Sequence, residues 1–153
     1  MYIGYSKSIN AASAEHEGKY PASKAAKVLG VSMAALKRCM QPCEWHHTSC
    51  RYNHTDYYDT KSVSSLMLGE MKEYDERKKA ERQARTTKDA KKIEACVNSG
   101  DELLMGSVAA NPAITVEQLK KLVETGSPYT SYMATLNPNV TDEIKRLYKN
   151  RWK

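Results

Sequence analysis

Phenylalanine is absent from this sequence of 153 residues, and so are long apolar runs. Hydrophobic residues make up 41% of the chain, and ten tyrosines and two tryptophans supply all of its aromatic side chains. We therefore expect a small core of Leu, Val, Ala and Met, which disfavours a large enzyme core. No stretch approaches the roughly 18 apolar residues of a membrane-spanning helix, and the first residues lack the pattern of a signal peptide. These absences predict a soluble, cytoplasmic protein with no membrane partner.

Several motifs of common enzymes are missing as well. The sequence has no phosphate-binding glycine loop, no dinucleotide glycine fingerprint, no serine elbow and no His-Glu-x-x-His helix. These absences disfavour the common ATPases, dehydrogenases, hydrolases and zinc proteases, and we expect a binding protein before an enzyme. Cysteine is scarce, with four residues, and in a reducing compartment these predict thiols or metal ligands in place of disulfides.

Positive charge exceeds negative charge moderately, with 24 Lys and Arg against 18 Asp and Glu, a net charge of +6. This excess favours an acidic partner, either nucleic acid or an acidic protein surface. It concentrates between Arg77 and Lys92, where basic residues far outnumber acidic ones. A break is predicted at Thr86-Thr87. Opposite charges four residues apart predict an exposed helix before it, at Glu73–Arg77, Asp75–Lys79 and Glu81–Arg85.

Small and apolar residues recur at helical spacing on both sides of Gly30, which predicts two short helices that meet at a glycine turn. Ser32 suits the N-cap of the second helix, and Pro42 predicts its end. Residues 22–40 therefore resemble a helix-turn-helix unit. The resemblance implies that the second helix enters the major groove, with Met33 and the two alanines after it facing the base edges. Because these residues offer few hydrogen-bond donors, any sequence-specific reading would be weak.

The last third of the chain contains a repeat with an offset of 26 residues. Each copy reads as a turn, a threonine cap and an acidic first helical turn, and Thr115 with Gln118 predicts a capping box. The matching pairs are Gly100/Gly126, Asn111-Pro112/Asn137-Pro138, Thr115/Thr141 and Glu117/Glu143. Residues 98–150 resemble variant leucine-rich repeats, which implies short helices stacked in a solenoid. Two copies are visible, so we expect them to pack on the rest of the chain.

These patterns together predict a mainly α-helical protein in three segments. Residues 1–60 hold the helix-turn-helix and an aromatic segment rich in Cys and His. Residues 61–96 form a charged helix or linker, and residues 97–153 form the helical repeat pair.

Residues 43–59 are the most chemically dense part of the chain and are predicted to form a loop or a short hairpin. Their residue types leave three interpretations open. The favoured one is a surface that stacks on bases or anchors a protein partner. The second is a tetrahedral zinc site with the ligands Cys39, Cys43, Cys50 and His54, although the spacing matches no common zinc motif. The third is acid–base catalysis of phosphoryl transfer by His46, His47 and His54.

We therefore predict a small nucleic-acid-associated regulatory or accessory protein, whose mosaic of partial motifs resembles bacteriophage accessory proteins. No resident cofactor is expected, with zinc as the exception that the cysteines leave open. The first alternative is an inhibitor or adaptor that binds a host enzyme, and the second is a small histidine-dependent nuclease. The predicted nucleic-acid contacts are Lys24, Lys27, Lys37, Arg38, Trp45, Arg51, Tyr52, Arg82 and Arg85.

Overall fold

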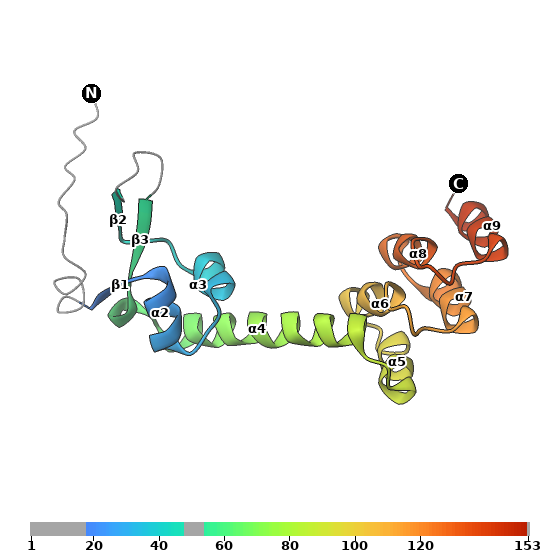
Figure 1. Ribbon diagram of the computed structural model, residues 1–153, viewed down its shortest axis with the longest axis horizontal. Coiled ribbons are helices and arrows are strands. Elements are labelled where there is room, and N and C mark those ends of the chain that lie inside the picture. Colours follow the sequence, from blue (N-terminus) through green and yellow to red (C-terminus); the bar gives the residue numbers. More distant parts are fainter. Residues whose placement is uncertain (1–17, 48–53, 153) are drawn as a thin grey trace, which may run out of the picture. The chain divides into compact units, whose positions relative to one another are not determined.

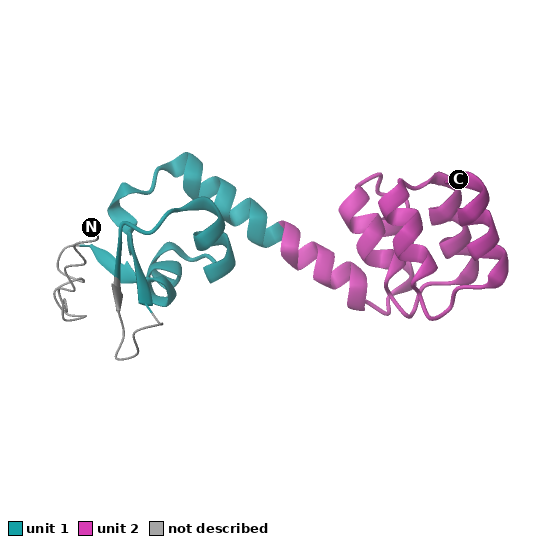
Figure 2. Ribbon diagram, turned by 90° about the horizontal axis from the view of Figure 1, so that it is seen from above, with its two compact units in different colours: residues 1–76 teal, residues 77–153 magenta. Residues whose placement is uncertain are grey.

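The computed structural model describes residues 18–47 and 54–152, which are mainly helical, as the sequence predicts (Figure 1). Their eight α-helices are accompanied by one small sheet of three strands. The chain divides into two compact units, residues 1–76 (unit 1) and residues 77–153 (unit 2) (Figure 2). Each helix in the described ranges is too short or too polar to cross a lipid bilayer.

Unit 1 combines two short helices with an antiparallel sheet of strand order β1-β3-β2. Helix α2 packs on β3, and the small core of unit 1 includes Leu36, Tyr58 and Met71. The elements are β1 (Lys19–Pro21), α2 (Ala22–Leu29), α3 (Met33–Cys39), β2 (Glu44–His47), β3 (His54–Asp59), η1 (Thr60–Ser62) and the first part of α4 (Ser65–Thr86).

The connection between α2 and α3 lies where the sequence predicts it. Gly30 ends α2 with a φ of +67°, a left-handed conformation that glycine adopts without a steric penalty. Ser32 then caps α3, because its hydroxyl oxygen accepts a hydrogen bond from the Ala35 N–H at 3.1 Å. The helix pair is therefore fixed locally, while its assignment as a DNA-reading unit stays a prediction.

Unit 2 is a stack of helices that follows the second half of α4. Its core is built from aliphatic side chains such as Val108, Leu119, Leu122 and Ile144. Helix α6 packs mainly on α8, and α7 packs on α8 and α9. The helices are α5 (Ala90–Val97), α6 (Glu102–Ala109), α7 (Val116–Thr125), α8 (Pro128–Thr135) and α9 (Asp142–Arg151).

The 26-residue repeat extends one copy further toward the N-terminus than the two copies expected from the sequence. Asp89 caps α5 at the position equivalent to Thr115 on α7 and Thr141 on α9. The capping box predicted for Thr115 and Gln118 is confirmed, with reciprocal hydrogen bonds of 3.2 and 3.1 Å. The end of α4 and helix α5 therefore form an additional copy.

Buried asparagines join successive turns of this stack. Asn111 Nδ2 donates to the carbonyl oxygens of Ala84 and Thr87, both at 2.8 Å. One repeat later, Asn137 Nδ2 donates to the carbonyls of Ala109 and Asn111 at 2.6 and 2.9 Å. Both asparagines are almost fully buried. We call this series the asparagine ladder. It gives side-chain donors to main-chain oxygens near the helix ends, of which Asn111 O also accepts from the Ile114 N–H.

Candidate nucleic-acid interface

Six basic side chains between residues 79 and 92 form an exposed group in unit 2, which we call the basic cluster. The first three lie three residues apart on α4, so they are neighbours along one helix surface, and the buried Ala84 lies on the side that faces the core. The other three lie just before α5 and in its first turn. The cluster consists of Lys79, Arg82, Arg85, Lys88, Lys91 and Lys92, all exposed.

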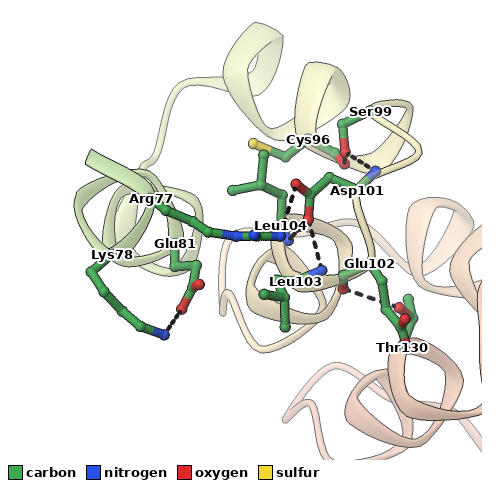
Figure 3. A network of polar contacts seen from close by, with 10 residues as sticks. All are labelled: Arg77, Lys78, Glu81, Cys96, Ser99, Asp101, Glu102, Leu103, Leu104 and Thr130. Atoms are coloured by element: carbon green, nitrogen blue, oxygen red, sulfur yellow. Dashed lines mark hydrogen bonds and ion pairs between the residues drawn. The ribbon is translucent and has the colours of Figure 1, made fainter. Parts of the chain in front are cut away.

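No member of the basic cluster makes an ion pair with a residue that the structure describes. The two basic residues just before it are paired (Figure 3). Arg77 Nη2 lies 3.6 Å from Asp101 Oδ2, and Lys78 Nζ lies 2.8 Å from Glu81 Oε2. Glu81 therefore neutralises Lys78. The other carboxylate between residues 79 and 92, Asp89, caps α5, so the six basic residues keep a net positive charge.

The position of Lys91 and Lys92 adds to the positive electrostatic potential of the basic cluster. Lys91 and Lys92 lie in the first turn of α5, next to the N-cap Asp89, whose carboxylate accepts a hydrogen bond from the Lys91 N–H at 3.0 Å. A cation at this end of a helix is unfavourable by about 0.3–1 kcal/mol at the surface. The Asp89 carboxylate offsets part of this cost, and a phosphate bound by the two lysines would offset more of it.

The sequence also predicts nucleic-acid contacts on the helix pair of unit 1. Two of these basic residues are less available for phosphates than the basic cluster is. Lys24 Nζ lies 5.3 Å from the centre of the Tyr20 ring, and Arg38 Cζ lies 5.2 Å from the centre of the Tyr74 ring. Both cations thus already have an aromatic neighbour within unit 1. Lys27 and Lys37 are exposed to solvent.

A carboxylate at the start of α3 is the feature of this surface that the sequence analysis missed. Asp75 on α4 accepts a hydrogen bond from the Ser32 N–H at 2.7 Å, and its other oxygen accepts one from the Ser32 hydroxyl. The predicted pairing of Asp75 with Lys79 would have left this helix end free. Because the carboxylate places negative charge at the first turn of α3, it disfavours the approach of phosphates there.

The aromatic segment, residues 43–59, contains β2 and β3, which pair antiparallel. Of the two forms that the sequence predicts, a loop or a short hairpin, the hairpin is the one observed. Trp45 is 56% exposed, and its ring meets the His54 ring edge-on at 6.0 Å between centres. His54 Nε2 also lies 3.1 Å from Asp56 Oδ1. The structure thus brings three side chains together on the hairpin, and more than half of the tryptophan is exposed.

Several predicted site residues lie outside the part that the structure describes. Cys50, Arg51 and Tyr52 fall in the undescribed segment 48–53, and His46 and His47 are placed only as backbone positions of β2. The nuclease interpretation therefore has one described side chain, that of His54, and it stays a prediction.

The cysteines assigned to zinc show no assembled site in the described ranges. Cys39 is half-buried, and Cys43 is exposed with its thiol donating to the Tyr57 carbonyl at 3.3 Å. No group of three possible metal ligands occurs within residues 18–47 and 54–152. Because Cys50 lies outside these ranges, the zinc site also stays a prediction.

Two groups with shifted pKa values sit in the cores. Burial raises the pKa of the Tyr58 phenol, and the nearby Asp56 carboxylate raises it further. Burial also raises the pKa of the Cys96 thiol, which packs against the core of unit 2. A neutral, half-buried thiol is a poor nucleophile, so this cysteine has a packing role.

An open cavity of about 520 Å³ lies in unit 2 between the turns before α6 and α8. Its polar groups bind one another, since Lys121 donates to Asn98 at 2.6 Å and Ser127 donates to Glu102 at 2.6 Å. The cavity thus gathers no unpaired charge of one sign, in contrast to the basic cluster. Comparison of the chain with protein-family models, with curated proteins and with solved structures finds no match.

Proposed function

We propose that this protein binds nucleic acid through the phosphate backbone and with little sequence preference. The observation that supports this function is the basic cluster, six exposed cations without an ion-pair partner among the described residues. Phosphate contacts of this kind contribute most of non-specific affinity, because each one releases a condensed counterion. Within residues 18–47 and 54–152, no comparable group of side chains supports a protein-binding or a nuclease function.

The surroundings of α3 support the proposal that the protein does not recognise a base sequence. Its first exposed positions are Met33 and Ala34, which offer no side-chain donors for base edges. The Asp75 carboxylate at the same end repels phosphates. Binding would therefore depend on backbone contacts, which position a protein on nucleic acid without identifying the sequence.

The hairpin offers a second, independent type of contact. The exposed ring of Trp45 can stack on an unpaired base, an interaction worth about 1–3 kcal/mol per base. Stacking of this kind needs an unstacked base and is tolerant of sequence. It favours single-stranded regions over regular duplex.

The salt dependence of binding tests the proposal quantitatively. If all six cluster side chains contact phosphates, the logarithm of the binding constant falls with the logarithm of salt concentration with a slope of about −5 for duplex DNA and about −4 for single strands. Replacing Arg82 and Arg85 by glutamine removes two contacts and reduces the magnitude of the duplex slope by about 1.8. Fluorescence anisotropy with labelled random-sequence DNA and RNA at several salt concentrations measures both values.

The matched control replaces two exposed lysines of α9, Lys145 and Lys149, by glutamine. It changes the net charge by the same amount and leaves the cluster intact, so its slope should equal that of the wild type. Equal slopes for the two double variants would contradict the role of the cluster. No binding at low salt would overturn the proposal, and the adaptor function would then be the prediction to pursue.

A further inference from the structure

An open groove of about 240 Å³ lies within unit 2, where one member of the basic cluster lines it. Three helices form the groove, and the residues that α4 contributes follow the spacing of one helix face. Its apolar walls consist of Ala80 and Ala84 from α4, Ala95 and Cys96 from α5, and Leu104 from α6. We call it the α4–α5 groove. Because the Ala84 carbonyl accepts a hydrogen bond from the buried Asn111, the asparagine ladder holds the α4 wall in place.

The first copy of the repeat has small side chains where the groove opens. Ala95 and Cys96 are equivalent to Lys121 and Leu122 of the next copy. Leu122 is fully buried in the core, whereas Cys96 is half-buried and Ala95 is exposed. The first copy therefore has less side-chain volume at this place than the next copy has.

Polar groups lie on the rim of the α4–α5 groove. Gln83 is exposed, and its side-chain amide makes no hydrogen bond to a residue within 18–47 and 54–152. The Thr87 hydroxyl accepts a hydrogen bond from the Asp89 N–H at 3.2 Å and keeps its own proton for another partner. An apolar wall beside such donors and acceptors suits a nucleobase, whose faces pack on apolar side chains while its edge forms hydrogen bonds.

Positive charge surrounds the same groove. Lys92, a member of the basic cluster, lines it directly. Lys79 lies four residues before Gln83, on the neighbouring turn of α4, and Lys88 follows the groove residue Thr87. Of the side chains that the structure describes, no carboxylate lines the groove. Its charge therefore favours an anionic occupant.

We propose that the α4–α5 groove holds one unpaired base of a single-stranded nucleic acid whose phosphates lie on the basic cluster. The inference rests on the proposed function and adds the substrate class. A volume of about 240 Å³ is below the roughly 300–1,000 Å³ of pockets for drug-sized ligands, which suits one base better than a larger molecule. The bases of a regular duplex stay paired and stacked, so a duplex contacts the cluster through its phosphates alone.

Fluorescence anisotropy with the full chain tests the proposal on three labelled ligands of equal length. They are a single strand, a duplex and an abasic strand, which has the same phosphates and no bases. The double substitution Ala80→Leu and Ala95→Leu narrows the groove from both walls at exposed positions and leaves the charge unchanged. We expect it to weaken binding of the single strand about tenfold and to leave binding of the duplex and the abasic strand unchanged.

The matched control is the double substitution Ala90→Leu and Ala113→Leu. It adds the same volume at two exposed alanines of unit 2 that do not line the groove. Its affinity for all three ligands should equal that of the wild type, and circular dichroism should show both double variants folded.

The outcomes separate this inference from the proposed function. If none of the three ligands binds at low salt, the proposed function itself fails. If they bind and the groove variant retains wild-type affinity for the single strand, or loses affinity for the abasic strand equally, only the groove inference is overturned. Binding of polyglutamate that the groove variant weakens, with single-strand binding unchanged, would overturn it in favour of an acidic protein partner.

Discussion

The asparagine ladder yields a quantitative prediction for the substitution Asn111→Ala. The side chain is 1% exposed and makes three hydrogen bonds, two from Nδ2 to the Ala84 and Thr87 carbonyls and one to Oδ1 from the Ala113 N–H, all at 2.8 Å. Each neutral hydrogen bond contributes about 1 kcal/mol net, so the variant should lose about 3 kcal/mol of the free energy of unfolding of unit 2. Asn111→Asp should lose more, because a carboxylate then faces two carbonyl oxygens.

The assay uses a single fluorescent reporter for unit 2. The chain has two tryptophans, and Trp45→Phe leaves Trp152 in α9's C-terminal flank as the only one. Urea unfolding in this background gives the midpoint and the slope for unit 2. The control Asn150→Ala removes an exposed asparagine of α9 and should change the free energy by less than about 0.5 kcal/mol. A loss below about 1 kcal/mol for Asn111→Ala, or an Asn111→Asp variant as stable as the alanine variant, would refute the reasoning.

Two further predictions concern unit 1. The raised pKa of Tyr58 means that the folded chain keeps this proton to higher pH than the unfolded chain, so the associated stability is complete below the ordinary tyrosine pKa of about 10 and is lost as the pH rises through the folded value. The free energy of unfolding should therefore fall more steeply above about pH 10 in the wild type than in Tyr58→Phe, and parallel curves would contradict this. Asp75→Ala removes both hydrogen bonds to Ser32 and should destabilise unit 1 by about 1 kcal/mol in thermal unfolding. The same variant should gain no sequence preference in nucleic-acid binding, and such a gain would show that α3 reads bases.

The elements that depend on neighbours in sequence could be predicted. Gly30 and Ser32 define the turn and the cap between α2 and α3, and Thr115 with Gln118 defines the start of α7. In each case the backbone conformation or the cap bond involves residues at most four apart. The helix break after Thr86 lies where the Thr-Thr pair predicts it.

The first copy of the repeat escaped the sequence analysis for a physical reason. Asn111 and Asn137 are needed because each reaches back to carbonyls of the preceding turn. The turn after α4 is the first of the series, so in the asparagine ladder its carbonyls accept from Asn111 and no earlier turn needs a donor from it. It therefore carries no asparagine and no matching Asn-Pro signature. Its cap is also an aspartate, Asp89, in place of threonine.

Contacts between residues distant in sequence explain why the ion pairs at the candidate site differ from the predicted ones. The sequence spacing assigned Asp75 to Lys79 and Arg77 to Glu73, but Asp75 binds Ser32 and Arg77 pairs with Asp101. These partners are 43 and 24 residues away along the chain, and only tertiary structure brings them close. Whether the basic cluster makes ion pairs also depends on tertiary structure, because the partners of the nearby carboxylates are set by residues distant in sequence.

The side-chain bonds between successive turns also restrict how unit 2 could change in length during evolution. An asparagine that reaches carbonyls about 26 residues earlier tolerates no arbitrary insertion between donor and acceptor, since the shift would break two buried bonds at once. A duplication of one complete copy would preserve every such bond. Growth or shrinkage by whole modules is therefore the route that this architecture permits.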